Sequence, residues 1–289
     1  CVLKATDRFK VLARRTNTGS TVAENAAARV TAILENGGVD PIIGAAYRNI
    51  NPGGYATRNL VAYVYDEVNT LQALNDVALS DGGAMFMDAY GVFTFQGTRF
   101  RTDNTRATTS QGTFGNTPTA IPVENDLDPT VSDSIMANYV TVTCGDGSVD
   151  VAQDAASIAE DGLLVLDIGN TLLNPLDGPD RAADVLLLRK DPRPRFRSVT
   201  VDCTTSDDAM TQALEREISD RITIALVPPG ASQGYSRPQY VEAISHDVSI
   251  TARTWETTFS VSGGYGGAQL IAADGTSLEF YGANYSEGY

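Results

Sequence analysis

The sequence contains one histidine and three cysteines in 289 residues. Nucleophilic triads and zinc sites draw heavily on imidazole, so a single histidine argues against most acid–base and metal-dependent chemistries. His246 falls in the middle of an expected strand, where we interpret it as a hydrogen-bonded strand side chain. Cys1, Cys144 and Cys203 form no CxxC pair, so they predict neither a disulfide framework nor a thiolate metal site. We expect them to be partly buried thiols on strands.

Long apolar runs and several catalytic signatures are also missing. No run approaches the roughly 20 apolar residues of a membrane-spanning helix, so no membrane span is expected. HExxH, P-loop, EF-hand and G-x-G-x-x-G patterns do not occur. We therefore predict a protein that is not an enzyme, uses no cofactor, and has no catalytic, cofactor-binding or metal residue. The first residue is Cys, and residues 2–7 resemble the end of a strand, so we expect the chain to begin inside a longer polypeptide.

Positive charge is scarce in this chain. Asp and Glu total 36 against 21 Lys and Arg, which gives a formal net charge of −15. Because phosphate binding requires a surplus of cations, a general nucleic-acid binder is not expected. One basic cluster stands out, formed by Arg189, Lys190, Arg193, Arg195 and Arg197. Contact with passing DNA is one interpretation, but we favour cations that complement a helix C-terminus and an acidic neighbouring subunit.

The densest acidic set lies in a Pro-containing stretch and consists of Glu124, Asp126, Asp128 and Asp133. Three interpretations compete for it. The carboxylates are solvated loop charges, a weak Ca²⁺ site, or a glycosidase-like pair of acids. We favour solvated charges because the EF-hand spacing is absent, and calcium binding stays open as the second interpretation.

Capping signals predict two helices near the start of the chain. Asp7 is expected to cap a helix that reaches about Arg15. Thr21 and Glu24 have the form of a capping box before a second helix over residues 26–34. Helices this short need a sheet or each other as support.

A third helix is expected over residues 70–79, with Asn69 and Gln72 as its capping box. Residues 84–95 follow it and predict a hairpin around a tight turn. Residues 102–129 are rich in Thr, Asn, Gly and Pro, so we expect a long loop or linker there.

The second half mixes strands with helices and predicts an irregular β-barrel or sandwich. The expected strands cover residues 139–144, 162–168, 196–203 and 222–227. The expected helices cover residues 179–191 and 207–218, the second with Thr205 and Asp208 as its capping box.

Two hairpins are expected to close the chain. The first pairs residues 240–250 with 254–261, and its apolar residues share one parity in each strand, namely Tyr240, Ile244, Val248 and Ile250, then Trp255, Phe259 and Val261. Each strand can therefore lay one face on a core. A shorter hairpin is expected between residues 269–272 and 277–280 around Asp274-Gly275.

Three segments carry a resemblance to a known family. They are residues 5–13 (ATDRFKVLA), residues 83–95 (GAMFMDAYGVFTF), and the closing pair VEAISH and WETTF at residues 241–246 and 255–259. In this order they resemble segments of the minor tail proteins of long-tailed actinobacteriophages. Those proteins are similar to the tail-hub family, which includes the baseplate hubs of contractile phages and the spike proteins of type VI secretion.

The resemblance implies an α+β, β-barrel-rich tail-hub fold with a helix-plus-hairpin module. It implies a homotrimer at the tail tip of the virion, whose two barrels per subunit form a pseudo-sixfold ring. The implied partners are distal tail and tail-tube proteins, the tape measure protein and tail-tip proteins, with DNA only in transit. The expected domains are the end of a first hub barrel (1–16), the helix-plus-hairpin module (17–101), a linker (102–132), a second hub barrel with inserted helices (133–262) and a Gly/Tyr-rich extension (263–289).

Two alternative functions belong to other classes. The chain could be a tail-associated cell-wall hydrolase, or an adhesin that binds a host receptor or glycan. Aromatic residues near the end favour glycan contact, because rings stack on sugars, and these are Tyr265, Tyr281, Tyr285 and Tyr289. Aromatic residues also fill subunit contacts, so the sequence does not separate these alternatives from the structural role.

Overall fold

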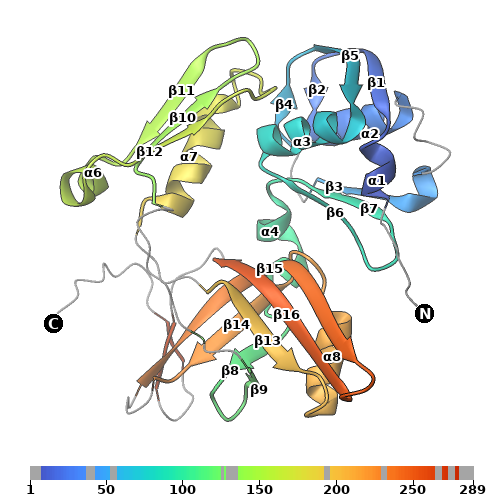
Figure 1. The fold of residues 1–289 in the computed structure, drawn as a ribbon. Helices are drawn as coiled ribbons and strands as arrows, with labels where there is room; N and C mark the ends of the chain where they lie inside the picture. The colour runs from blue at the N-terminus through green and yellow to red at the C-terminus, as the bar shows by residue number, and fades with distance from the viewer. Residues whose placement is uncertain are drawn as a thin grey trace. The chain divides into compact units, whose positions relative to one another are not determined.

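The structure, a computed structural model, describes residues 8–36, 43–52, 57–124, 127, 136–191, 196–228, 233–263, 269–272 and 277–279. The chain divides into two compact units. Unit 1 comprises Cys1–Asn104 and Ser132–Arg193, and unit 2 comprises Thr105–Val131 and Pro194–Tyr289. Both combine helices with largely antiparallel sheets (Figure 1), so the predicted α+β class is confirmed. Within the described ranges, no helix is long and apolar enough to cross a membrane.

The first part of unit 1 packs helices against small sheets. Its helices are α1 (Phe9–Leu12), α2 (Ala26–Asn36), the 3-10 helix η1 (Ala45–Tyr47), α3 (Thr70–Asp81) and α4 (Phe100–Asp103). Its strands are β1 (Thr16–Thr21), β2 (Glu24–Asn25), β3 (Arg48–Asn51), β4 (Asn59–Leu60), β5 (Tyr63–Asn69), β6 (Ala84–Met87) and β7 (Phe93–Gln96). β1 pairs with β5, β2 with β4, and β7 lies between β3 and β6. The hairpin predicted for residues 84–95 is therefore confirmed as β6 and β7.

The ends of α3 follow the predicted signals. Asn69 Oδ1 accepts a hydrogen bond from the backbone N–H of Gln72 at 3.1 Å, which caps the helix. The helix ends at Gly82, whose φ of 79° is a left-handed conformation that glycine adopts without a Cβ penalty. Between these ends Leu74 and Val77 are fully buried and join the core of unit 1.

The start of α2 corrects one prediction. Thr21 lies in β1 and Glu24 in β2, so the predicted capping box is wrong. Asn25 Oδ1 instead accepts a hydrogen bond from the backbone N–H of Ala28 at 2.9 Å. Strands β1 and β2 contain the positions that the box required, and a strand as short as β2 leaves no periodicity in the sequence. Asp7, the expected cap of the first helix, lies outside the described residues.

The second part of unit 1 is a three-stranded sheet with a helix on one face (Figure 1). Its elements are β10 (Tyr139–Thr143), β11 (Val149–Gln153), α6 (Ala155–Asp161), β12 (Val165–Ile168) and α7 (Gly178–Arg189). β10 is central, antiparallel to β11 and parallel to β12. Ala182 and Val185 of α7 share a buried core with Val140 and Val142 of β10. The helix predicted over residues 179–191 is thus confirmed, with Pro179 in its first turn.

Arg58 connects the two parts of unit 1. Its backbone N–H donates to Asp81 Oδ1 at 2.9 Å, and its guanidinium Nη2 lies 2.5 Å from Asp184 Oδ2 on α7. Asp81 also accepts a hydrogen bond from the N–H of Thr98 at 2.8 Å. Burial raises the pKa of Asp81, and the two backbone donors and Arg58 oppose that rise. The carboxylate therefore fixes three chain segments at the end of α3.

Unit 2 is built around one large sheet. Its helices are α5 (Thr105–Thr108) and α8 (Asp207–Glu215). Its strands are β8 (Thr113–Gly115), β9 (Ile121–Pro122), β13 (Ser198–Asp202), β14 (Arg221–Leu226), β15 (Gln233–Ser249), β16 (Thr254–Gly263), β17 (Gln269–Ala272) and β18 (Ser277–Glu279). The main order is β13-β16-β15-β14-β8-β9, with β17 on β15 and β18 on β17. The short hairpin expected at residues 269–280 is confirmed as β17 and β18.

The two ends of this sheet meet at Glu124, which follows β9. The N–H of Glu124 donates to the carbonyl of Thr200 in β13 at 2.8 Å. The sheet therefore curves until the segment that follows β9 contacts β13. Among the described residues, β9 and β13 themselves are not paired. The core inside the curve includes the buried residues Phe114, Val199, Ile222, Ile224 and Phe259. At the start of α8 the cap is Ser206, whose Oγ accepts the N–H of Ala209, and not the predicted Thr205.

The compact units divide the chain differently from the expected ranges. β8 and β9 lie inside the expected linker 102–132, and β10 to β12 lie inside the expected barrel 133–262 although they belong to unit 1. β8 pairs in parallel with β14, far along the chain. A Cβ on Gly115, which has φ of +150°, would lie 1.8 Å from the carbonyl oxygen of Ala225. This close approach, which only glycine permits, is a long-range contact that no local pattern announces.

The closing hairpin is confirmed as β15 and β16, but its faces differ from the prediction. The pairing register shifts between Val241 and Ala243, so Glu242 forms a bulge. Tyr240 and Ile244, predicted on one face, therefore lie on opposite faces. Beyond the bulge Val248 and Ile250 are 60% and 90% exposed, so the predicted core contact of these two residues is wrong.

Candidate functional site

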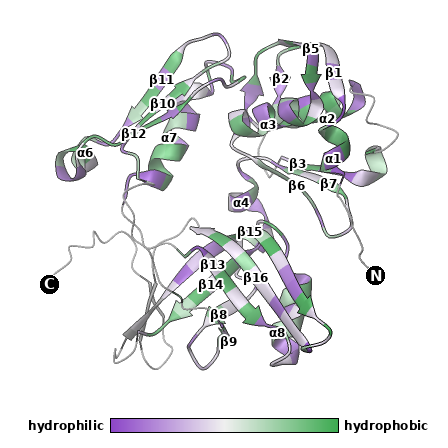
Figure 2. Ribbon diagram, viewed as in Figure 1, coloured by the Kyte–Doolittle hydropathy of each residue, from purple (hydrophilic) through white to green (hydrophobic). Residues whose placement is uncertain are grey.

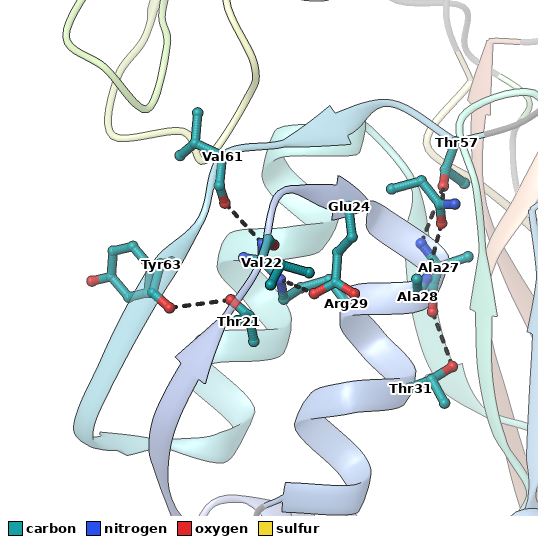
Figure 3. Close-up of polar contacts among 11 residues, drawn as sticks. Thr21, Val22, Glu24, Ala27, Ala28, Arg29, Thr31, Thr57, Val61 and Tyr63 are labelled. Atoms are coloured by element: carbon teal, nitrogen blue, oxygen red, sulfur yellow. Dashed lines mark hydrogen bonds and ion pairs between the residues drawn. The ribbon is translucent and has the colours of Figure 1, made fainter.

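A fully buried arginine forms the centre of a polar network on α2 (Figure 3). Arg29 Nε lies 2.7 Å from Glu24 Oε1, and Nη2 donates to the carbonyls of Val22 and Val61 at 2.8 Å each. A buried charge is tolerated when it is paired and hydrogen-bonded. The network ties the segment before α2 to the connection between β4 and β5, which is a structural role. Sequence reasoning missed Arg29, because a charged residue on a helix normally indicates a solvated face.

A cavity of about 430 Å³ opens beside the start of α2. It is lined by Asn25, Ala27, Ala28, Thr31, Ile50, Pro52 and Thr57. Helix N-termini attract anions because their first N–H groups lack partners. Here the N–H of Ala27 donates to Thr57 Oγ1 at 3.1 Å and that of Ala28 to Asn25 Oδ1 (Figure 3). Two donors are thus satisfied by the protein, and the described residues of the lining offer no ionisable group for proton transfer.

The two described thiols, those of Cys144 and Cys203, are both buried. Cys144 Sγ lies 3.4 Å from Asp150 Oδ2, and burial together with this carboxylate raises the pKa of Cys144 to about 11. Cys203 Sγ lies 3.1 Å from Thr257 Oγ1, and that hydroxyl lies 2.8 Å from His246 Nδ1. His246 is therefore a hydrogen-bonded strand side chain, as predicted. A thiol that keeps its proton is a weak nucleophile, so Cys144 does not indicate catalysis.

At Lys190 the basic cluster fits one part of the favoured interpretation, a cation at a helix C-terminus. Lys190 Nζ lies 2.8 Å from Asp154 Oδ2, and Asp154 caps α6. This partner lowers the pKa of Asp154, as do the N–H groups at the helix start. Lys190 itself follows the last turn of α7, where a cation complements the helix dipole. Arg193 and Arg195 lie outside the described residues.

The acidic set is described at one position. Glu124 is exposed, and its backbone joins β13 as stated above. Asp126, Asp128 and Asp133 lie outside the described residues, so calcium binding stays a prediction. In the part of the chain that the structure describes, no three His, Cys, Asp or Glu residues are placed to hold a metal ion.

One catalytic pattern, G-x-S-x-G, occurs at residues 230–234. A nucleophile elbow requires this pattern where a strand turns into a helix. Here the pattern leads into β15, which begins at Gln233. The described part of the pattern, Gln233 and Gly234, therefore belongs to a strand and not to the helix that an elbow requires, so it gives no support for a hydrolase.

The sheet face of β10, β11 and β12 that α7 does not cover carries several exposed apolar residues, and we name it the open face. Alternation places Tyr139, Thr141, Thr143, Val149, Val151, Gln153, Val165 and Asp167 on it. Its three valines are 56%, 48% and 59% exposed, in chain order. Hydrophobic residues are visible on β10 and β11 (Figure 2). Thr141 Oγ1 donates to Asp167 Oδ1 at 2.6 Å, so the single carboxylate on the face is hydrogen-bonded within it.

No family model matches the chain, and no curated protein matches it. Among solved structures, the chain is similar to one described as a tail protein from Neisseria meningitidis MC58. The two share 12% sequence identity with a TM-score of 0.55, and the alignment covers 86% of this chain and 69% of the other. At this identity the likeness establishes a shared fold.

Proposed function

We propose that the protein is a structural component of a bacteriophage tail. The observation that carries this proposal is the fold shared with the Neisseria meningitidis tail protein over 86% of the chain. The sequence resemblance to actinophage minor tail proteins points to the same class. The finer proposal is a homotrimeric tail hub at the tip of the virion, which joins the tail tube to the distal tip and surrounds the channel for DNA ejection.

The open face supports a role in assembly. Monomeric proteins rarely leave a contiguous apolar sheet face in water, and such faces mark interaction sites. Val149, Val151 and Val165 present this kind of surface around Thr141, and β-branched side chains on a sheet lose little rotamer freedom on contact. In the proposed trimer this face packs against a neighbouring copy.

Charge favours a second copy as the occupant of the open face. Each chain carries a formal net charge of −15, so two copies repel each other wherever carboxylates meet. The open face carries one carboxylate, Asp167, and that group already accepts the Thr141 hydroxyl. Contact through this face therefore brings few like charges together, as expected for the core of a subunit interface.

Light scattering of the purified protein, with particle imaging, tests the proposal. We expect three times the chain mass of 30.7 kDa and rings with a central opening. Antibody labelling of virions should place the protein at the tail tip. A monomer at micromolar concentration, together with label elsewhere than on the tail, refutes the proposed function. Release of soluble fragments from host peptidoglycan would favour the hydrolase instead.

Variants on matched valines test the open face itself. Val151→Asp adds a charge to the face and should convert the trimer to monomers. Val64→Asp is the control, because Val64 lies on β5 outside the face and is 69% exposed. Unchanged circular dichroism in both variants excludes misfolding. If Val151→Asp stays trimeric, the open face is not the interface.

A further inference from the structure

The outer half of β15 has one side without a strand partner among the described residues. On its other side β15 pairs with β16 as far as Ser249. β14 pairs with β15 between Tyr235 and Tyr240, and the last backbone bonds on that side involve Val241. Residues 243–249, which we name the β15 edge, continue past this point in the long hairpin of β15 and β16 (Figure 1). Unpaired backbone N–H and C=O groups on an edge of this length form a template for another strand.

The core of unit 2 loses its cover toward the β15 edge. Val201, Thr257 and His246 are paired neighbours across three strands. Val201 and Thr257 are 1% and 0% exposed, whereas His246 is exposed. On the next row Val248 lies opposite Trp255 and is 60% exposed. Core-facing positions therefore become accessible toward this edge, where no further strand among the described residues covers them.

The opposite face of the same strands carries a row of carboxylates. Asp202 of β13 lies opposite Glu256 of β16, and Glu256 lies opposite Asp247 of β15. Directly opposite side chains are about 5 Å apart at Cβ, so like charges there destabilise the sheet. Asp202 is held by the N–H and hydroxyl of Thr204 at 2.8 and 2.6 Å, which lower its pKa. The row ends at the β15 edge with Asp247.

We propose that the β15 edge accepts an extended strand from a partner protein, and that this strand carries Lys or Arg opposite Asp247. Backbone pairing supplies the binding, as in other cases of strand addition to a sheet edge. The row Asp202–Glu256–Asp247 contains only carboxylates. A cation opposite Asp247 would continue this row and offset the repulsion between them. Strand residues opposite His246 and Val248 lie on the core face and are apolar. The required pattern is thus apolar, basic, apolar at successive positions.

The same row disfavours a second copy of this chain as the occupant. An identical edge would bring its own Asp247 to the row and add to the repulsion between like charges. The inference does not depend on the proposed function, because it uses only the pairing, exposure and charge of β13, β15 and β16.

Hydrogen–deuterium exchange of the full chain with two synthetic peptides tests the proposal. One peptide alternates valine with lysine, and the other alternates valine with glutamate. We expect the valine–lysine peptide to slow exchange at residues 243–249 and to bind at least about tenfold more tightly than the other. Asp247→Lys should reverse this preference. Glu160→Lys, at an exposed residue of α6 in unit 1, changes the net charge equally and should keep it.

Four outcomes would overturn the proposal. Unchanged exchange at residues 243–249 with saturating valine–lysine peptide shows that the edge accepts no strand. Equal affinity for both peptides, or an unchanged preference in a folded Asp247→Lys variant, removes the role of the carboxylate row. Protection that appears without peptide as the protein concentration rises identifies a second copy as the occupant.

Discussion

Replacing Arg29 by methionine is expected to destabilise unit 1 by about 3 kcal/mol. The Arg29 side chain is fully buried, and Glu24 is 19% exposed. Loss of the guanidinium leaves the Glu24 carboxylate without a cation and the carbonyls of Val22 and Val61 without a donor. Removing one partner of a buried pair costs about 3 to 5 kcal/mol. Because Glu24 is partly exposed, water can solvate its carboxylate when the cation is lost. We therefore expect a loss of stability at the lower end of this range.

Urea and thermal unfolding with two probes can assign this loss to unit 1. Trp255 is the only tryptophan and lies in unit 2, so its fluorescence reports that unit. Far-UV circular dichroism also reports α2, α3 and α7, which lie in unit 1. For Arg29→Met we expect a circular-dichroism midpoint about 6 to 12 °C lower on heating. The midpoint of the Trp255 fluorescence should stay unchanged.

A double variant separates the ion pair from simple packing loss. Arg29→Met combined with Glu24→Leu leaves no carboxylate without a cation, so it should be more stable than Arg29→Met alone. The reasoning fails if Arg29→Met costs less than about 1 kcal/mol, the value of a single ordinary hydrogen bond. It also fails if the double variant loses the sum of the two single losses.

Three further predictions concern a helix cap, a thiol and the core of unit 2. Asn69→Ala should lower the free energy of unfolding by about 1 kcal/mol in thermal melts, and Gln72→Ala by less, because the cap uses the backbone of Gln72. Since the folded pKa of Cys144 is raised from 9.0 to about 11, the unfolded chain loses this proton first. Stability measured by urea titration should therefore fall as pH rises from 9.0 to about 11, and Cys144→Ala should remove this part of the fall. Phe259→Ala should lower the free energy of unfolding by about 3 to 5 kcal/mol. Trp255→Ala should lower it less, because Phe259 is fully buried and Trp255 is half-buried. A larger loss of stability for Trp255→Ala, measured by circular dichroism, would contradict this order.

Elements with a local signal could be predicted from the sequence. The helix α3 follows from Asn69 and Gly82, and α7 from Pro179, because caps and breakers act within a few residues of the helix end. The long hairpin of β15 and β16 follows from alternating apolar residues on both sides of a short turn. In each case the residues that determine the element lie inside it or next to it.

Elements that depend on distant partners could not be predicted. β8 has three residues and exists through parallel pairing with β14. The buried Arg29 side chain is paired with Glu24 and donates to the carbonyl of Val61. Val61 lies 32 residues further along the chain, so no local pattern links it to Arg29. The charge of Arg29 indicated a solvated residue, as a charge usually does. The assignment of residues 139–168 to unit 1 similarly depends on contacts with α7.

The β15 edge shows how one residue can redirect a surface. Strict alternation along residues 240–250 would place Tyr240 and Val248 on one buried face, and the strand would then look complete. The bulge at Glu242 shifts the register by one residue and increases the local twist. Pairing with β14 ends at the same point, where the last backbone bonds involve Val241. The bulge therefore coincides with the change from a paired strand to an open edge, and beyond it the core-facing Val248 and the carboxylate of Asp247 are both accessible to a partner strand.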